Sequence, residues 1–579
     1  MRTMRVFRRV GAYYREQLWP TVLGGASVAA SALVALQAPG IVRRAVDALA
    51  AGVGVAELWR YAALILLVAV GSGIFLFTQR RLLVGVSRHI EHRLRTDLFA
   101  HLLRLPPAFY MRERVGDLLT RATSDVGTVR MAVGPALMYA INTVTVMITA
   151  TVLMARIHPV LTGLSLAVVP LVAGATKIFG EMIHSRWGRT QEALSRYTAR
   201  LQEHLVGLRV LRAYTCEPAE MAEMAGRNRE YVAASARLIS VQAVFQPLLQ
   251  ALIGLSFVVV LGYGGNAVRN GAMTLGQFVE FNLYVVRLIW PMIAVGWVSN
   301  LLQRGAASMT RIEELFAEKP LAEEPSELVT AGVAAPSRPA AVEVREAAFA
   351  YPGCREPALA RVSLAARPGQ RVAIVGEVAS GKSTLLSLLP RLLEPAPGTV
   401  LIDGVDVLRL PLDRLRREVA LVPQGAFLFS ATLRENIALA RPDATEDEVR
   451  AAAVAAGLED ELARFPDGLE TVVGERGVTL SGGQRQRVAI ARALITNPRL
   501  LLLDDCLSAV DTQTERVILS SLPDTTLVFA THRLAAAELC DRIVVLERGR
   551  VVETGSPVEL AARGGRYARL LALQRLETA

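Results

Sequence analysis

A short glycine-containing loop in the C-terminal half carries residues that can bind phosphate. The loop consists of Gly376, Glu377, Val378, Ala379, Ser380, Gly381, Lys382, Ser383 and Thr384. It lies between two apolar runs, Arg371–Val375 and Leu385–Leu393, which predicts a strand, the loop and then a helix. Backbone N–H groups of such a loop surround phosphate oxygens, and the helix N-terminus adds its positive end. We expect Lys382 to reach the β- and γ-phosphates and Ser383 to offer its hydroxyl to Mg²⁺.

Other residues that could complete this site follow short apolar runs. Leu500–Leu503 ends in Asp504, which lets a buried strand deliver a carboxylate to a metal. Asp505 comes next, and the remaining candidates are Gln424 after the strand expected at Val419–Val422, His532 after the strand expected at Thr526–Ala530, Tyr351 ahead of the glycine loop, and the Leu-Ser-Gly-Gly-Gln sequence with Ser481, Gly482, Gly483 and Gln484. This set predicts a nucleotide site on an α/β domain.

Six long runs with few or no charges occupy the first 303 residues. They are Leu18–Val42, Tyr61–Gln79, Met131–Ala155, Pro159–Thr176, Leu238–Val268 and Gly276–Gln303. Each approaches or exceeds the roughly 18–20 residues that a helix needs to cross about 30 Å of hydrocarbon. The sequence therefore predicts six membrane-spanning helices rather than the buried helices of a large soluble protein.

The positive charge of the chain is concentrated beside these runs. The formal net charge is +11, and five arginines precede the first run, while Arg80, Arg81, Arg88, Arg93 and Arg95 follow the second. Arginines gather on the cytoplasmic side of membrane proteins, so the N-terminus and the long loops are expected there, and six spans return the C-terminus to the same side. This placement favours a membrane surface over nucleic acid as the reason for the charge.

Polar residues interrupt the fifth and sixth runs. Glu280 and Arg287 are seven residues apart and share one face of the expected helix. Charged residues inside a span usually face protein or water. The two therefore line a substrate cavity, or else Glu280 lies at the membrane interface and Arg287 makes a structural ion pair. Gln242, Gln246 and Gln250 form a stripe that suits either a water-filled path or hydrogen bonds between helices.

These patterns divide the chain into three parts. Residues 1–320 are expected to form the membrane domain with long cytoplasmic extensions, and residues 341–579 a water-soluble domain. Residues 321–340 are rich in Ala, Glu and Pro, which is typical of a linker. The four cysteines show no metal-ligand spacing, which indicates reduced thiols in a cytosolic compartment.

In order and spacing, the motifs of the C-terminal half resemble those of the ATP-binding cassette (ABC) proteins. The Leu-Ser-Gly-Gly-Gln signature at 480–484 is highly specific to that family. With the six spans, the resemblance covers nearly the whole chain. It implies an all-α six-helix transmembrane domain followed by an α/β P-loop ABC nucleotide-binding domain. Such a half-transporter of the type IV exporter architecture would work as a dimer in the inner (plasma) membrane, with ATP and Mg²⁺ as cofactors.

The resemblance also assigns roles to single residues. It implies that Tyr351 stacks on adenine, that Gln424 joins Ser383 and Asp504 around Mg²⁺, and that His532 contacts the γ-phosphate. The signature would close over ATP held by the opposite subunit. Three further segments resemble elements of the family: coupling regions near Gly116–Asp125 and Arg212–Glu217, and the exporter X-loop at Thr471–Gly477.

Three positions depart from the family pattern, of which Gly425, where an acid is frequent, carries no inference. Ala379 stands where a glycine is usual, which the loop tolerates if the backbone φ stays negative. Asp505 stands where the family has the glutamate that positions the attacking water. Aspartate is one methylene shorter, so its carboxylate falls about 1.5 Å short, and a general base contributes roughly 10²–10⁴-fold. An intact signature beside a weakened base resembles one half of a heterodimer with two unequal ATP sites.

The sequence therefore predicts one subunit of an ATP-driven exporter of amphiphilic small molecules or peptides. Its partners would be a second half-transporter, the lipid bilayer and the substrate, and no nucleic acid is expected. A homodimeric exporter or lipid flippase, in which Asp505 is a poor base, is the alternative. A membrane regulator or channel that binds ATP without pumping is an alternative of another class. Neither the fold nor the motifs identify the substrate.

Overall fold

The computed structural model describes residues 8–320, 339–474, 477 and 479–578, and it divides into two compact units. One comprises Met1–Leu103 and Arg114–Glu318, and the other Arg104–Glu113 and Lys319–Ala579. Apart from its last two positions, the expected linker lies outside the described residues. The first unit is helical and the second is an α/β domain, which confirms the predicted fold class.

The helical unit consists of long helices joined by short turns. In chain order these are α2 (Arg8–Glu16), α3 (Leu18–Ala35), α4 (Ala38–Ala50), α5 (Val55–Gln79), α6 (Gly85–Arg104), α8 (Val115–Thr120), α9 (Val126–Val133), α10 (Pro135–Ile157), α11 (Pro159–Leu166), α12 (Val168–Val206), α13 (Leu208–Ala213), α14 (Glu217–Val259), α15 (Gly265–Arg269) and α16 (Leu275–Ala317). Single π-helical turns at Arg80–Val84, Arg121–Asp125 and Val260–Gly264 make several neighbours continuous.

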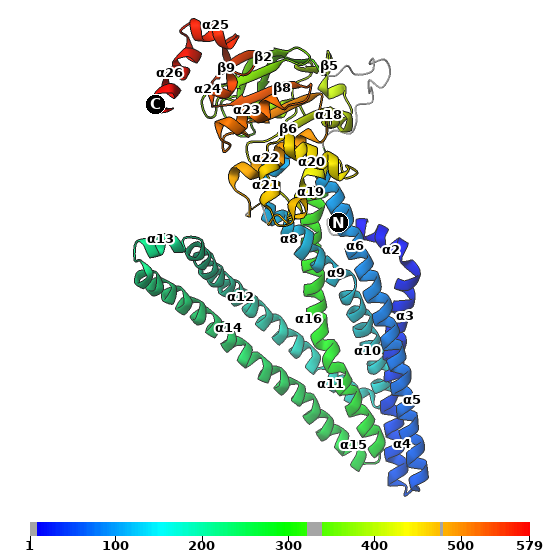
Figure 1. Ribbon diagram of the computed structural model, residues 1–579. Helices are drawn as coiled ribbons and strands as arrows, with labels where there is room; N and C mark the ends of the chain where they lie inside the picture. Colours follow the sequence, from blue (N-terminus) through cyan, green and yellow to red (C-terminus); the bar gives the residue numbers. More distant parts are fainter. Residues whose placement is uncertain (1–7, 321–338, 475–476, 478, 579) are drawn as a thin grey trace. The chain divides into compact units, whose positions relative to one another are not determined.

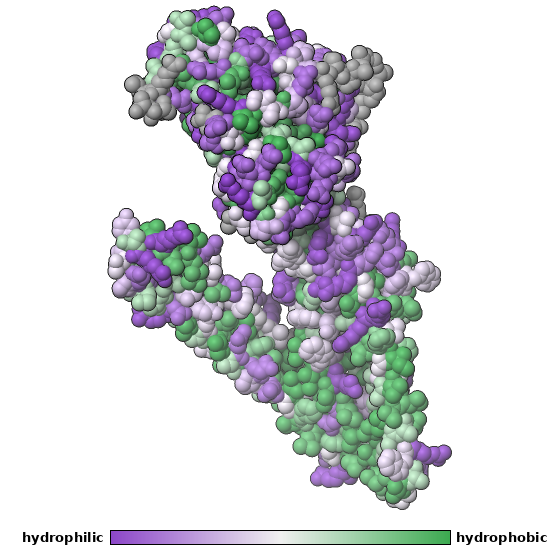
Figure 2. Space-filling model, in the orientation of Figure 1, coloured by the Kyte–Doolittle hydropathy of each residue, from purple (hydrophilic) through white to green (hydrophobic). Residues whose placement is uncertain are grey.

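Six helical stretches are long and apolar enough to cross a membrane. They are Leu18–Ala50, Val55–Arg104, Val115–Ile157, Pro159–Val206, Glu217–Arg269 and Leu275–Ala317. The apolar window of the second is not buried at all within the chain. Figure 2 shows hydrophobic surface over much of this unit and polar surface on its helical extensions. Apolar surface of this extent requires lipid or another subunit around it.

The helices form a bundle and a diverging pair. In Figure 1, α12 and α14 run side by side and away from the bundle that contains α3, α5, α10 and α16. Stacked rings of Phe179 and Phe245 and a hydrogen bond from Arg186 to the Arg237 carbonyl (2.8 Å) join the pair. In the bundle, Phe281 and Tyr284 of α16 are buried against α3, α10 and α11.

The α/β unit contains two sheets. The six-stranded sheet has the order β10-β9-β3-β8-β7-β6, in which only the β9–β10 pair is antiparallel. Its strands are β3 (Arg371–Val375), β6 (Val419–Val422), β7 (Leu500–Asp504), β8 (Thr526–Thr531), β9 (Arg542–Glu547) and β10 (Arg550–Gly555). The antiparallel sheet contains β1 (Val342–Phe349), β2 (Leu359–Ala366), β4 (Val400–Ile402) and β5 (Val405–Asp406). Strands β3, β7 and β8 are buried on both faces, as parallel strands covered by helices are.

A short segment from the N-terminal half groups with the α/β unit. It contains α7 (Pro107–Arg112), where Phe109 is only 4% exposed. The coupling region expected near Gly116–Asp125 lies a few residues later, in the helical unit. Arg104–Glu113 is therefore the part of this loop that belongs to the nucleotide domain.

Candidate functional site

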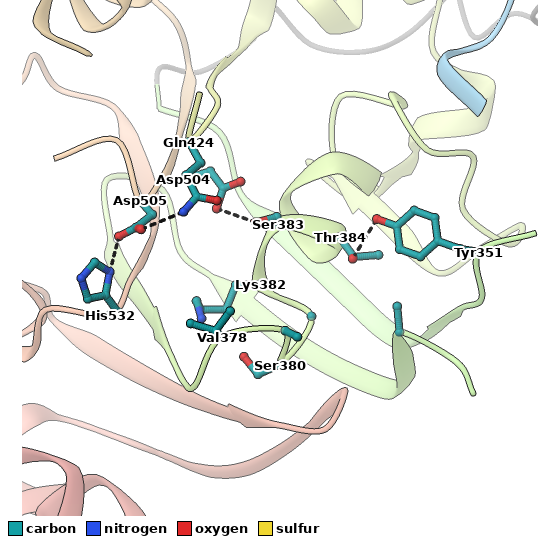
Figure 3. Close-up of a pocket in the computed structure, with 13 residues that line it drawn as sticks. Tyr351, Val378, Ser380, Lys382, Ser383, Thr384, Gln424, Asp504, Asp505 and His532 are labelled. Atoms are coloured by element: carbon teal, nitrogen blue, oxygen red, sulfur yellow. Dashed lines mark hydrogen bonds and ion pairs between the residues drawn. The ribbon is translucent and has the colours of Figure 1, made fainter. Parts of the chain in front are cut away.

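The candidate nucleotide site lies where four parallel strands end. Strands β3, β8, β7 and β6 are in register at their carboxyl ends, with Val375 opposite Thr531, Asp504 opposite Ala530, and Val422 opposite Leu503. The loops that follow these strands surround a cavity of about 320 Å³ (Figure 3). It is lined by Tyr351, Ala358, Val378, Ala379, Ser380, Gly381, Lys382, Ser383, Thr384, Gln424, Asp504, Asp505 and His532. Ligands of open α/β sheets bind at this kind of edge.

The glycines of the loop are required by its close packing. A Cβ at Gly376 would lie 2.2 Å from the Leu546 carbonyl oxygen, and one at Gly381 would lie 2.6 Å from that of Ala358. Ala379 adopts φ +64°, so the condition under which the loop tolerates an alanine without strain is not met. An alanine in the left-handed region costs roughly 1–2 kcal/mol, so the surrounding loop must hold it in place. The Ser380 hydroxyl is buried there without a protein partner.

Lysine and carboxylate groups meet at the base of the cavity. The Lys382 ammonium donates to the carbonyls of Gly376 and Glu377, each at 2.8 Å, and the Ser383 hydroxyl donates to Asp504 at 2.9 Å. Burial lowers the pKa of Lys382, although the nearby carboxylates of Asp505 and Asp504 act to raise it. Burial also raises the pKa of Asp504. Both charged forms thus lack solvation, so a triphosphate beside the lysine and a divalent cation beside the carboxylate would suit this donor set.

Asp505 is held on both of its carboxylate oxygens. Nδ1 of His532 lies 2.7 Å from one oxygen, and the Gln424 amide donates to the other at 3.2 Å (Figure 3). The Asp505 backbone has φ +47°, and its N–H donates to the Ala530 carbonyl on the neighbouring strand. The structure therefore brings together three residues that the sequence placed after three different strands.

Tyr351 lies at the other side of the cavity. Its hydroxyl is 3.1 Å from the Thr384 hydroxyl, and its ring contacts Phe349 edge-on, with centroids 5.2 Å apart. Half-buried in this way, the ring is fixed next to the first turn of α17 (Lys382–Leu388). This position is compatible with the expected contact between Tyr351 and a base.

The signature residues do not line this cavity. Ser481 caps α22 (Gly482–Leu494), where its hydroxyl accepts from the Gln484 N–H at 3.2 Å and the Gln484 side chain accepts from the Ser481 N–H at 2.9 Å. A Cβ added at Gly483 would lie 2.7 Å from the Ala509 carbonyl oxygen, which is too close. A Cβ added at Gly482 would make only an ordinary van der Waals contact. The capped helix N-terminus is thus formed, and it does not line this chain's own cavity.

The hydrogen bonds of two residues near His532, Arg533 and Gln574, were not expected from the sequence. The guanidinium of Arg533 donates to the carbonyls of Leu507, Ser508 and Val510 and so fixes the loop after Asp505. The Gln574 side chain on α26 (Arg566–Thr578) accepts from the Leu534 N–H at 2.7 Å and donates to the His532 carbonyl at 3.4 Å. No local pattern marks Gln574, because its partners lie about 40 residues away.

The polar residues of the spans separate into different environments. The prediction that Glu280 lines a substrate cavity is corrected by the structure. Glu280 is only 7% exposed, and its carboxylate is held by Arg43 at 3.4 Å and by the Tyr284 hydroxyl at 3.1 Å. Arg287 lines a cavity of about 570 Å³ instead. The stripe of Gln242, Gln246 and Gln250 is exposed on α14, which leaves both of its interpretations open.

Both units match family models. Residues 21–292 match the ABC transporter transmembrane region, and residues 359–508 match the ABC transporter model. A solved bacterial Atm1-family ABC exporter with ATP bound superposes with a TM-score of 0.78 at 28% identity, covering 97% of this chain and 99% of the other.

Curated relatives extend over nearly the whole chain. The multidrug resistance-like ATP-binding protein MdlA of Escherichia coli is 36% identical, with 100% of this chain and 98% of the relative covered. The probable multidrug resistance transporter YheI of Bacillus subtilis is 34% identical, with 99% and 98% covered. An ATP-dependent lipid A-core flippase of Chromobacterium violaceum is 37% identical, with 84% and 83% covered. Matched along both of its units, the chain belongs to the ABC transporter family as a multi-pass membrane exporter that binds and hydrolyses ATP.

Proposed function

We propose that this chain is the slow-site subunit of a heterodimeric ABC exporter. The observation that carries the proposal is Asp505, the residue in the position of the general base. Its short carboxylate is engaged by His532 and Gln424 on both oxygens. To position an attacking water, this carboxylate would have to reach about 1.5 Å further, and a displacement of that size costs roughly 10²-fold. This site would bind ATP and turn it over slowly.

The partner's site would be completed by this chain's signature. Ser481, Gly482 and the N-terminus of α22 offer donors and a positive helix end to a phosphate, and they are not among the described residues that line this chain's own cavity. A second subunit is also favoured by the tip of the α12–α14 pair. Val206, Val210 and Tyr214 are 60–83% exposed there, on a segment beyond the apolar runs. Apolar side chains in such a position suit a protein partner.

The cofactors would be ATP and Mg²⁺. The P-loop amides and Lys382 would hold the phosphates, while the Ser383 hydroxyl, Asp504 and the Gln424 side chain would hold the cation. Hard oxygen ligands of this kind fit Mg²⁺, which takes only one or two protein carboxylates and leaves other positions to phosphates and water. When bound, Mg²⁺ would polarise the phosphate oxygens of ATP, while the protein residues would position the attacking water and exclude other water molecules.

The first prediction concerns Lys382. Replacing it with alanine should weaken ATP binding to this chain roughly 10- to 100-fold, because a charge-assisted hydrogen bond contributes about 1.5–3 kcal/mol. Lys382→Arg should also fail, since a planar fork does not fit between the two carbonyls that hold the ammonium. Photocrosslinking of azido-ATP to this subunit measures the effect, with Lys319→Ala, an exposed lysine, as control. Unchanged labelling in both Lys382 variants would refute the assignment.

The transported substrate would be an amphiphilic small molecule or peptide. A cavity of about 760 Å³ lies between α10, α12 and α16, large enough for a drug-sized ligand. Met147, Met292 and Trp297 give it adaptable apolar walls, while Lys177 and Glu181 supply both signs of charge. The arginines beside the spans would place the N-terminus and the nucleotide domain in the cytoplasm, so that ATP drives export.

The second prediction tests the proposed function. The purified chain alone should show little ATPase, since both sites of a homodimer would contain Asp505, and co-expression with a half-transporter from the neighbouring gene should raise the rate tenfold or more. ATPase in nanodiscs measures this. Robust hydrolysis by a demonstrated homodimer would favour the homodimeric exporter instead. ATP-driven accumulation of an amphiphilic dye in inside-out vesicles would exclude a regulator or channel that does not pump.

A further inference from the structure

A second cavity in the helical unit carries a single unpaired cation. It lies between α3, α5, α10 and α16, and Arg287 is the only charged residue among the described residues that line it. Within the described part of the chain, no carboxylate lies at ion-pair distance from Arg287, and Glu280, which shares its helix face, is held by Arg43 and Tyr284. The cavity therefore keeps a net positive charge.

The depth of Arg287 makes this charge expensive without a ligand. It lies twelve residues after Leu275, the start of α16, which corresponds to about 18 Å along the helix, well inside a hydrocarbon layer of about 30 Å. Arginine at that depth is rare unless it meets water, a partner charge or a function. Its planar fork is suited to carboxylate or phosphate oxygens.

A second polar residue, Gln79, contributes to the lining of the same cavity. Gln79, at the end of α5, is 7% exposed, and its side-chain oxygen is buried with no hydrogen-bond partner. A buried unpaired amide oxygen costs free energy unless a donor reaches it. A hydroxyl or N–H group on a ligand head would supply that donor once the Gln79 amide turned toward the cavity.

Most of the remaining lining is apolar and leaves room for a chain, with Ser31, Ser72 and Asn142 as the polar exceptions. Small residues of α3 and α5, among them Ala35, Ala69 and Gly73, form one side, and Trp290 lies on the other. Small side chains let an acyl or alkyl chain approach the helix backbones, and the indole ring offers it a flat apolar surface.

We propose that Arg287 and Gln79 form a head-group site for an anionic amphiphile, with a carboxylate or phosphate on Arg287 and its chain along α3 and α5. That this amphiphile is cargo rests on the proposed export function, whereas the binding site itself does not. A membrane lipid and a cytoplasmic amphiphile share this chemistry.

Equilibrium binding without ATP tests the site. The complex in phosphatidylcholine nanodiscs is titrated with dodecyl phosphate, dodecyltrimethylammonium or inorganic phosphate, with tryptophan fluorescence as the signal and Trp290→Phe to locate it. We expect dodecyl phosphate to bind at least tenfold more tightly than the other two. Arg287→Gln should remove that preference, Arg287→Lys should retain part of it, and Gln79→Leu should weaken binding several-fold. Arg304→Gln, an exposed arginine on the same helix, is the matched control.

The outcomes separate the site from its use. Equal binding of the cationic and anionic amphiphiles, or unchanged binding in Arg287→Gln, would overturn the site. Equal affinity for inorganic phosphate and dodecyl phosphate would show that the alkyl chain does not contribute to binding and would overturn the assignment of an amphiphilic ligand. If dodecyl phosphate binds but neither stimulates ATPase nor is moved by ATP in vesicles, the cargo assignment is wrong. Failure of the site would leave ATP-driven transport of other amphiphiles unaffected, so the two proposals fail independently.

Discussion

In the transporter assembled with its partner, Gly482→Asp in this chain should lower steady-state ATPase roughly 10²–10³-fold. The signature of this chain would complete the partner's site, where the γ-phosphate develops charge during hydrolysis. An aspartate at the N-terminus of α22 would put a like charge against that phosphate in place of backbone donors. The variant should fold, because a Cβ at Gly482 meets only the Ala509 methyl carbon, at 3.6 Å.

Two controls make this result specific. Gly482→Ala adds the Cβ without the charge and should retain much of the activity. Azido-ATP labelling of this chain should be unchanged in Gly482→Asp, since the signature does not line this chain's own cavity. Loss of labelling on this chain, with the partner's labelling preserved, would show that the signature serves this chain's own ATP site and not the partner's.

Substitutions of Asp505 should behave in the opposite way. Asp505→Ala should change steady-state ATPase of the assembled transporter less than about threefold, because a site with a poor base contributes little to the total. Asp505→Glu should accelerate hydrolysis at this site by roughly 10²-fold, since the added methylene returns the carboxylate to the reach of a general base. A loss in Asp505→Ala as severe as that in Gly482→Asp would show that Asp505 is a working base.

Most of the nucleotide site follows from local sequence patterns. Strand β3 occupies the predicted residues, and Asp504 ends β7 as expected, because a buried parallel strand leaves a continuous apolar run with the functional residue after it. Convergence of Gln424, Asp505 and His532 follows once their strands are parallel neighbours. The left-handed backbone of Ala379 could not be predicted, since it depends on the packing of the whole loop.

The membrane half shows where sequence reasoning ends. Apolar run lengths predict six spans, because crossing hydrocarbon fixes a minimum length. They do not fix which polar side chains pair. Glu280 and Arg287 share a helix face. Even so, Glu280 is paired with Arg43, which is 237 residues away in the sequence, whereas Arg287 lines a cavity. The Gln574 contact with the His532 loop depends in the same way on how distant segments pack.

Single-turnover hydrolysis tests the inequality of the two ATP sites most directly. The assembled transporter is loaded with radiolabelled ATP at both sites in the absence of Mg²⁺, and hydrolysis is started by adding Mg²⁺ with excess unlabelled ATP. We predict two phases of equal amplitude, with the slow one roughly 10²-fold slower, and Asp505→Glu should merge them into one fast phase. A single fast phase in the unaltered protein, with loss of half its amplitude in Asp505→Ala, would contradict the account.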